Sequence, residues 1–115
     1  EREFELAPFG MTGLETSLGV ILTYLVRPGF ISYERMVELM AIAPREILGL
    51  DPLSLKVGSC ADLTIFDPEL VWTVSADDMY SKAKNSGFLG FDLVGRATDV
   101  FVGGSLTMKE GRVVD

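Results

Sequence analysis

The chain has 115 residues, the length of one domain, and 48% apolar with 23% charged residues is typical of a folded globular protein. Seventeen acidic residues against ten basic ones give a formal net charge of −7. Nucleic acid is therefore not an expected partner, because a phosphate backbone attracts clustered lysine and arginine. We also expect no membrane partner, since the longest nearly unbroken apolar run, 18–26, falls short of the roughly 20 residues that a span requires.

The sequence contains no histidine and only one cysteine, Cys60. Histidine is the commonest metal ligand and the usual acid or base at neutral pH, so the familiar hydrolytic sites cannot be assembled from the residues of this chain. A site made of carboxylates alone would suit calcium or magnesium, but the Asp77-Asp78 pair stands alone and indicates a turn or a helix cap. A single cysteine and the lack of a signal peptide favour a cytoplasmic location.

The first informative segment, 7–16, reads Ala-Pro-Phe-Gly-Met-Thr-Gly-Leu-Glu-Thr. Pro8 restricts the backbone, and Gly10 has no Cβ to keep a ligand away from main-chain N–H groups. On these residues alone an ordinary loop remains the simpler interpretation. Thr12 and Glu15 have the spacing of a capping box, which predicts that a helix starts there.

Three helices are predicted in the first fifty residues. The first has apolar residues on most of its circumference, which predicts a helix covered on most sides, and it ends at Arg27-Pro28-Gly29. Ser32 is placed to cap a second helix over 33–40. Pro44 suits the first turn of a third, short helix, which Gly49 closes in a left-handed conformation.

The pattern changes to short strands after Asp51-Pro52, and we predict strands at 61–66, 71–74, 93–102, 105–108 and 112–114. Gly103-Gly104 predicts a tight hairpin, and 109–111 a looser turn. Helices followed by a few short strands leave the sheet with too few partners. We therefore expect the sheet to pair with a further part of the same polypeptide rather than with copies of itself in a homo-oligomer.

Several segments, taken in order, resemble one enzyme family. Ala7-Pro8-Phe9-Gly10 with Gly13-Leu14-Glu15-Thr16 resembles the segment that follows the last catalytic motif of dihydroorotases, in the amidohydrolase superfamily. Residues 81–90, Ser-Lys-Ala-Lys-Asn-Ser-Gly-Phe-Leu-Gly, are similar to a loop of the same branch. Weaker resemblances, shared across the superfamily, cover 43–50, 55–63 and 102–104.

The resemblance implies an α/β fold: the carboxyl-terminal part of a (β/α)8 TIM-type barrel, followed by strands of a small composite β-sandwich. Residues 1–50 would supply the barrel's last helices and a substrate loop, and 51–115 the sandwich strands. A barrel needs on the order of 250 residues, so this chain would be one part of a longer polypeptide. The sequence departs from the family pattern at Ala43, usually asparagine, at Gly87, usually proline, and at Cys60, usually a smaller residue.

The implied activity is the zinc-dependent interconversion of N-carbamoyl-L-aspartate and L-dihydroorotate in pyrimidine biosynthesis. By this resemblance the zinc ligands and the catalytic aspartate precede residue 1, and the chain alone is expected to be inactive. Phe9 and Gly10 would contact the substrate ring, mainly through backbone groups.

Other polar and core residues are expected to be structural. We predict that Lys82, Lys84 and Asn85 form a solvated loop and that Asp62 bonds turn amides. Cys60 is predicted to be a small buried residue and Trp72 part of the core.

Three alternatives remain open on the sequence. A dihydropyrimidinase, hydantoinase or allantoinase would share the fold and cyclic amide hydrolysis, although Ala-Pro-Phe-Gly argues against them. A non-catalytic dihydroorotase homologue would act as a scaffold for a transcarbamoylase. An independent binding module would need a partner for its apolar first helix.

Overall fold

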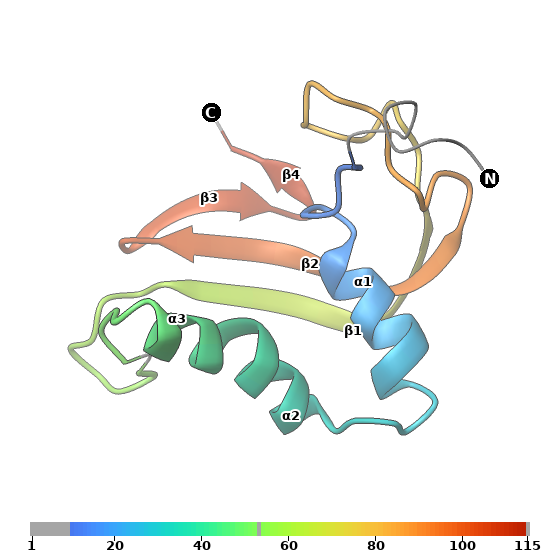
Figure 1. Ribbon diagram of the computed structural model, residues 1–115. Helices are drawn as coiled ribbons and strands as arrows, with labels where there is room; N and C mark the ends of the chain where they lie inside the picture. Colours follow the sequence, from blue (N-terminus) through green and yellow to red (C-terminus); the bar gives the residue numbers. More distant parts are fainter. Residues whose placement is uncertain (1–9, 53, 115) are drawn as a thin grey trace.

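The computed structural model describes residues 10–52 and 54–114, and it places two helical segments against one four-stranded antiparallel sheet (Figure 1). The strand order is β1-β2-β3-β4, so each strand pairs with its neighbour in sequence. Figure 1 shows the first helical segment crossing β1 and β2, and the second lying beside β1. The predicted α/β class is confirmed, whereas its assignment to a barrel and a sandwich stays a prediction.

The first helical segment consists of α1 (Ser17–Ile21), which continues into the π-helical turn η2 (Leu22–Val26). It begins later than predicted: Thr16 is the N-cap residue, and its side chain makes no capping hydrogen bond. The capping box predicted from Thr12 and Glu15 is therefore wrong. The end of the segment agrees with the prediction, since Gly29 adopts a φ of +82° in the turn that follows.

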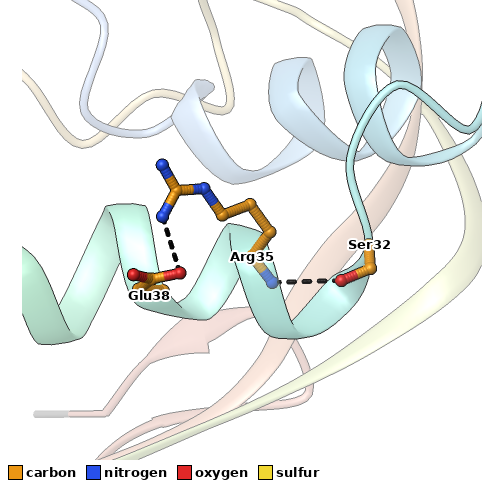
Figure 2. A network of polar contacts seen from close by, with 3 residues as sticks. All are labelled: Ser32, Arg35 and Glu38. Atoms are coloured by element: carbon orange, nitrogen blue, oxygen red, sulfur yellow. Dashed lines mark hydrogen bonds and ion pairs between the residues drawn. The ribbon is translucent and has the colours of Figure 1, made fainter.

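The second helical segment runs through α2 (Tyr33–Val37), the π-helical turn η3 (Glu38–Ile42) and α3 (Ala43–Ile47). Ser32 caps it as predicted, because its Oγ accepts the Arg35 N–H at 3.2 Å. Figure 2 shows this bond beside the 2.6 Å ion pair between Arg35 and Glu38. Gly49, at φ +65°, ends the run as predicted, with its N–H on the Glu46 carbonyl.

The prediction of separate second and third helices was wrong, and the π-helical turns supply the reason. Each turn ends two residues before a proline, at Val26 before Pro28 and at Ile42 before Pro44. The residue in front of each proline donates its N–H five residues back, Arg27 to Leu22 and Ala43 to Glu38. Proline lacks an N–H and crowds the carbonyl four residues earlier, so a locally wider helix accommodates its ring. At Pro44 the helix therefore continues.

The long strand β1 (Leu63–Thr73) replaces the two predicted strands at 61–66 and 71–74. It pairs with β2 (Asp92–Val102), and the register jumps from Asp67 opposite Arg96 to Val71 opposite Val94. The intervening residues 68–70 bulge out where Asp67 Oδ1 accepts the Glu69 N–H at 2.8 Å. Pro68 thus marks a bulge within one strand rather than a break between two.

Two tight hairpins complete the sheet. Gly103 and Gly104, at φ +57° and +83°, connect β2 to β3 (Ser105–Lys109) as predicted. Glu110 and Gly111, at φ +50° and +76°, connect β3 to β4 (Arg112–Val113). This second turn is therefore a two-residue turn, tighter than the sequence predicted.

Asp62 stabilises the first hairpin from the start of β1. Its Oδ1 accepts the Gly103 N–H at 2.7 Å, and the Gly104 N–H donates to the Ala61 carbonyl at 3.0 Å. The prediction that Asp62 bonds turn amides is confirmed. The contact also explains why an alanine-aspartate pair and a glycine-glycine pair occur together, because each supplies partners for the other.

The helical segment α1–η2 approaches the sheet closely at two glycines. A Cβ on Gly19 would lie 3.0 Å from Trp72 Cζ2, and one on Gly95 would lie 2.3 Å from Leu22 Cδ1. Trp72 Nε1 donates to the Gly95 carbonyl at 3.0 Å, and Thr23 Oγ1 accepts the Val94 N–H at 2.8 Å. The helix is thereby attached to the bulged part of the β1–β2 pair.

The core lies beside this contact and is small. Leu22, Val26 and Met36 are buried together, and Leu93 is fully buried in β2. Trp72 is half-buried against the helix, in line with its predicted core role.

The expected covering of the first helix on most sides is not present within the described residues. Leu14 is 94% exposed, and Tyr24 and Leu25 also reach the surface. Phe30, in the turn after the helix, is 76% exposed. No helix of the described chain has the length and apolar character needed to cross a membrane.

We predict that Gly95→Ala lowers the free energy of unfolding of the intact natural polypeptide by about 2–4 kcal/mol, because strain at positive φ adds to overpacking against Leu22. Gly90→Ala is the matched control, since Gly90 has a φ of +78° and open space around its Cβ position. We expect about 1 kcal/mol there, from the backbone alone. Denaturant unfolding measures both, and equal losses would contradict the role of Leu22.

We predict that Asp62→Ala destabilises the intact polypeptide by about 1–2 kcal/mol, because it leaves the Gly103 N–H without its acceptor. Asp62→Asn keeps an oxygen at the same place and is expected to cost less than half as much. Thermal unfolding of the two variants compares them. A larger loss for Asn than for Ala would show that the carboxylate acts by another route.

Candidate functional site

The segment after Gly10 lies against the loop that joins β1 to β2. Gly10 is exposed and has a φ of +89°, a conformation that glycine adopts without strain. Phe9, the other predicted substrate contact, lies outside the described residues. Of the two predicted contacts, the structure therefore describes only Gly10. It lies at the start of the segment that leads through Glu15 to α1.

Glu15 joins the segment to the loop. Its Oε2 accepts the Tyr80 N–H and its Oε1 accepts the Ser81 N–H, both at 2.9 Å. A carboxylate with an N–H on each oxygen holds two consecutive peptide groups, a stronger arrangement than a bond between neutral groups. These bonds explain the failed capping box, because the carboxylate binds amides 65 residues away rather than the backbone near Thr12.

Asn85 makes the second connection, at the other end of the segment. Its Nδ2 donates to the Gly10 carbonyl at 3.1 Å. Two residues further on, Gly87 leaves room for Met11, whose sulfur would lie 2.6 Å from a Cβ at position 87. The two motifs that resemble dihydroorotases most specifically, around Gly10 and at 81–90, are therefore in direct contact.

The loop over 75–91 is also held from within. Lys84 Nζ donates to the Met79 carbonyl, and the Phe88 N–H donates to the nearly buried Ser86 Oγ at 3.2 Å. Tyr80 Oη accepts the Val113 N–H of β4 at 3.0 Å. Three polar residues of this loop were predicted to be solvated. Lys82 is exposed, as predicted, whereas the side chains of Lys84 and Asn85 donate hydrogen bonds to main-chain carbonyls.

A wide groove adjoins this contact, with a volume of about 1710 Å³. Residues 11–19, part of the second helical segment and Tyr80-Ser81 line it. Thr12 Oγ1 borders the groove and is buried without a hydrogen-bond partner in the described chain. The groove is mostly apolar, and Leu14 and Leu55 on its walls are about nine-tenths exposed.

The described residues do not fit a zinc site. No three cysteine, aspartate or glutamate side chains gather within 10–52 and 54–114, and the sequence has no histidine. Asp77 and Asp78 lie in a turn, as predicted. Cys60 is exposed, so its predicted burial was wrong; it lies in the loop before β1, where helices and sheet leave it uncovered.

Several curated relatives of this chain carry the same name. A dihydroorotase from Geobacter metallireducens is 47% identical over 107 residues, which are 93% of this chain and 25% of that protein. A dihydroorotase from Chlorobaculum tepidum is 43% identical over 103 residues, 90% of this chain and 24% of that protein. This chain is homologous to a segment of dihydroorotases. It spans about a quarter of the length of these relatives, and no family model matches it.

Solved hydantoinases share the fold of this dihydroorotase homologue. An L-hydantoinase (dihydropyrimidinase) from Arthrobacter aurescens superposes with a TM-score of 0.84 at 38% identity, over 92% of this chain and 24% of that one. A D-hydantoinase from Thermus sp. gives 0.86 at 29% identity, over 96% and 25%. The arrangement of helices and sheet is thus one found within larger hydrolases.

The local sequence patterns did not predict that Glu15 and Asn85 join the two motifs. Glu15 was assigned to a helix cap, and Asn85 to a solvated loop. Their positions inside the two most specific motifs were the only available signal, since sequence spacing carries no information about contacts 65 to 75 residues apart.

We predict that Glu15→Ala loosens the loop over 75–91 and lowers the free energy of unfolding of the intact polypeptide by about 1–3 kcal/mol, because two amides lose their acceptor. Hydrogen exchange at the Tyr80 and Ser81 amides measures the loosening directly. Glu38→Ala is the control, since Glu38 is exposed and pairs only with Arg35 in the described chain. Unchanged exchange at both amides would contradict the role of Glu15.

Proposed function

We propose that this chain is the carboxyl-terminal part of a dihydroorotase that interconverts N-carbamoyl-L-aspartate and L-dihydroorotate in pyrimidine biosynthesis. The contact between the two specific motifs supports the proposal most directly. Asn85 on Gly10 and Glu15 on Tyr80-Ser81 make one unit of the two segments. Such a unit is suited to holding a small ring, because its main-chain groups have fixed directions.

In this proposal Phe9 and Gly10 form one wall of the substrate pocket. The Gly10 carbonyl already accepts the Asn85 amide, so main-chain N–H groups are the natural contacts for a substrate oxygen or carboxylate. Gly10 lets the substrate approach closely, because no Cβ stands between it and the backbone. Selectivity for a cyclic imide over an apolar ring follows from these directional bonds.

Zinc is part of the proposed enzyme, and its ligands belong to the rest of the polypeptide, as does the catalytic aspartate. The described residues offer no site for the ion, so they contribute binding and orientation rather than a chemical step. We expect the 115-residue chain on its own to be inactive with or without added zinc.

We further propose that the rest of the polypeptide, which supplies the remainder of a (β/α)8 barrel, covers the groove and its exposed apolar walls. This chain spans about a quarter of its relatives' length, and a mostly apolar groove with exposed leucines on its walls is typical of a surface that another part of a protein covers. Two strongly exposed leucines, Leu14 and Leu55, lie on the walls of the groove, and Phe30, Ile47, Leu48 and Val57 are strongly exposed elsewhere on the described chain.

One alternative has specific support, and the experiment that tests it also distinguishes a second. A hydantoinase or dihydropyrimidinase is favoured by the 38% identical L-hydantoinase, although the motif around Gly10 favours dihydroorotase. A non-catalytic homologue that serves as a scaffold for a transcarbamoylase would keep the same structural contacts. The intact polypeptide separates the three: it should convert carbamoyl aspartate and dihydroorotate faster than hydantoin or dihydrouracil. Preference for hydantoin would favour the first alternative, and no activity on any ring the second.

We predict that Gly10→Val in the intact enzyme raises the KM for dihydroorotate about 10-fold or more, because a β-branched residue at positive φ displaces the main-chain donors. Bound zinc should remain unchanged. Gly29→Val is the control, since Gly29 has a similar φ and open space but lies at the far end of the first helix. Steady-state kinetics and metal analysis measure both variants, and a parallel loss of zinc would contradict the assignment.

A further inference from the structure

We propose that Asn85 is a positioning residue for the substrate loop, acting through the Gly10 carbonyl. The proposal rests on the proposed function. Gly10 takes a positive φ and is exposed, and none of the other described residues lies within 4 Å of its Cβ position. Within the described part of the chain, the restraint on Gly10 that the structure shows is the 3.1 Å bond from Asn85 Nδ2 to its carbonyl.

Asn85 can act in this way because its own loop is anchored on both sides. The loop leaves and rejoins the sheet through paired bonds, Val74 N–H to the Phe91 carbonyl and Gly90 N–H to the Val74 carbonyl, each at 2.9 Å. Phe88 and Phe91 pack edge to face with ring centroids 5.8 Å apart. The restraint therefore runs from the sheet, through the loop, to the substrate segment.

Glu15 and Asn85 hold opposite ends of the 10–16 segment. Glu15 holds the helix end of the 10–16 segment against Tyr80-Ser81, whereas Asn85 holds the Gly10 end. Loss of Glu15 should disturb the whole loop. Loss of the Asn85 amide should release only the Gly10 peptide, and so affect substrate binding rather than folding or metal content.

The test compares two aspartate substitutions in the intact enzyme. Asn85→Asp has the same shape but replaces the Nδ2 donor with an oxygen that repels the Gly10 carbonyl. Ala83→Asp adds the same charge to the exposed part of the loop, two residues away. We expect Asn85→Asp to raise the KM for dihydroorotate about 3- to 10-fold, with kcat within about 2-fold, the size that one lost hydrogen bond implies.

Ala83→Asp should leave the KM within about 2-fold of the starting enzyme, and both variants should keep their zinc and melting temperature. An equal rise in both variants would overturn the proposal, because the effect would then come from charge. An unchanged KM in Asn85→Asp would overturn it too.

If Asn85→Asp folds poorly, Asn85→Ala removes the same donor without a charge and is expected to give the same rise in KM. An unchanged KM in that variant would equally overturn the role of Asn85. An intact enzyme with no activity on dihydroorotate before any substitution would instead overturn the proposed function.

Discussion

The contact between Leu22 and Gly95 is the constraint on which the rest of the structure depends. Leu22 occupies the place where any other residue at position 95 would carry its Cβ, so the helix lies against the backbone of β2 itself. The bulge over 68–70 stands opposite Gly95, and the Trp72 indole bonds the Gly95 carbonyl from the neighbouring strand. A helix attached at backbone distance has little freedom to slide or rotate, because packed side chains interdigitate at native density.

The candidate site inherits its geometry from that contact. Upstream of α1 the chain passes through Glu15 to Gly10, and beyond Val74 the sheet extends into the loop that carries Tyr80 and Asn85. Both segments therefore start from the contact between the helix and the sheet. They approach each other again a few residues later, where the Glu15 carboxylate and the Asn85 amide connect them. These backbone and side-chain hydrogen bonds give the exposed segment at Gly10 a defined conformation. A small ligand held by directional hydrogen bonds requires such a fixed backbone.

Features that depend on a few neighbouring residues were predictable from the sequence. The Ser32 cap, the helix ends at Gly29 and Gly49, and the Gly103-Gly104 hairpin each follow from local sterics and local hydrogen bonds. One error arose because a distant group changed the outcome: the Glu15 carboxylate left its expected cap for two remote amides. Two others arose at prolines, because the chain continued as a helix through Pro44 and as one strand past Pro68, where a π-helical turn and a bulge accommodate the ring.

The sequence by itself determined the class of the fold, the turns, and the resemblance that points to a dihydroorotase, since these depend on composition, periodicity and short motifs. The contacts that define the site were decided only by the tertiary structure. Asn85 and Gly10 are 75 residues apart, and a hydrogen bond across that separation exists only after helix and sheet have packed. Spacing along a chain encodes local geometry, whereas contacts between distant segments are set by the burial and close packing that bring them together.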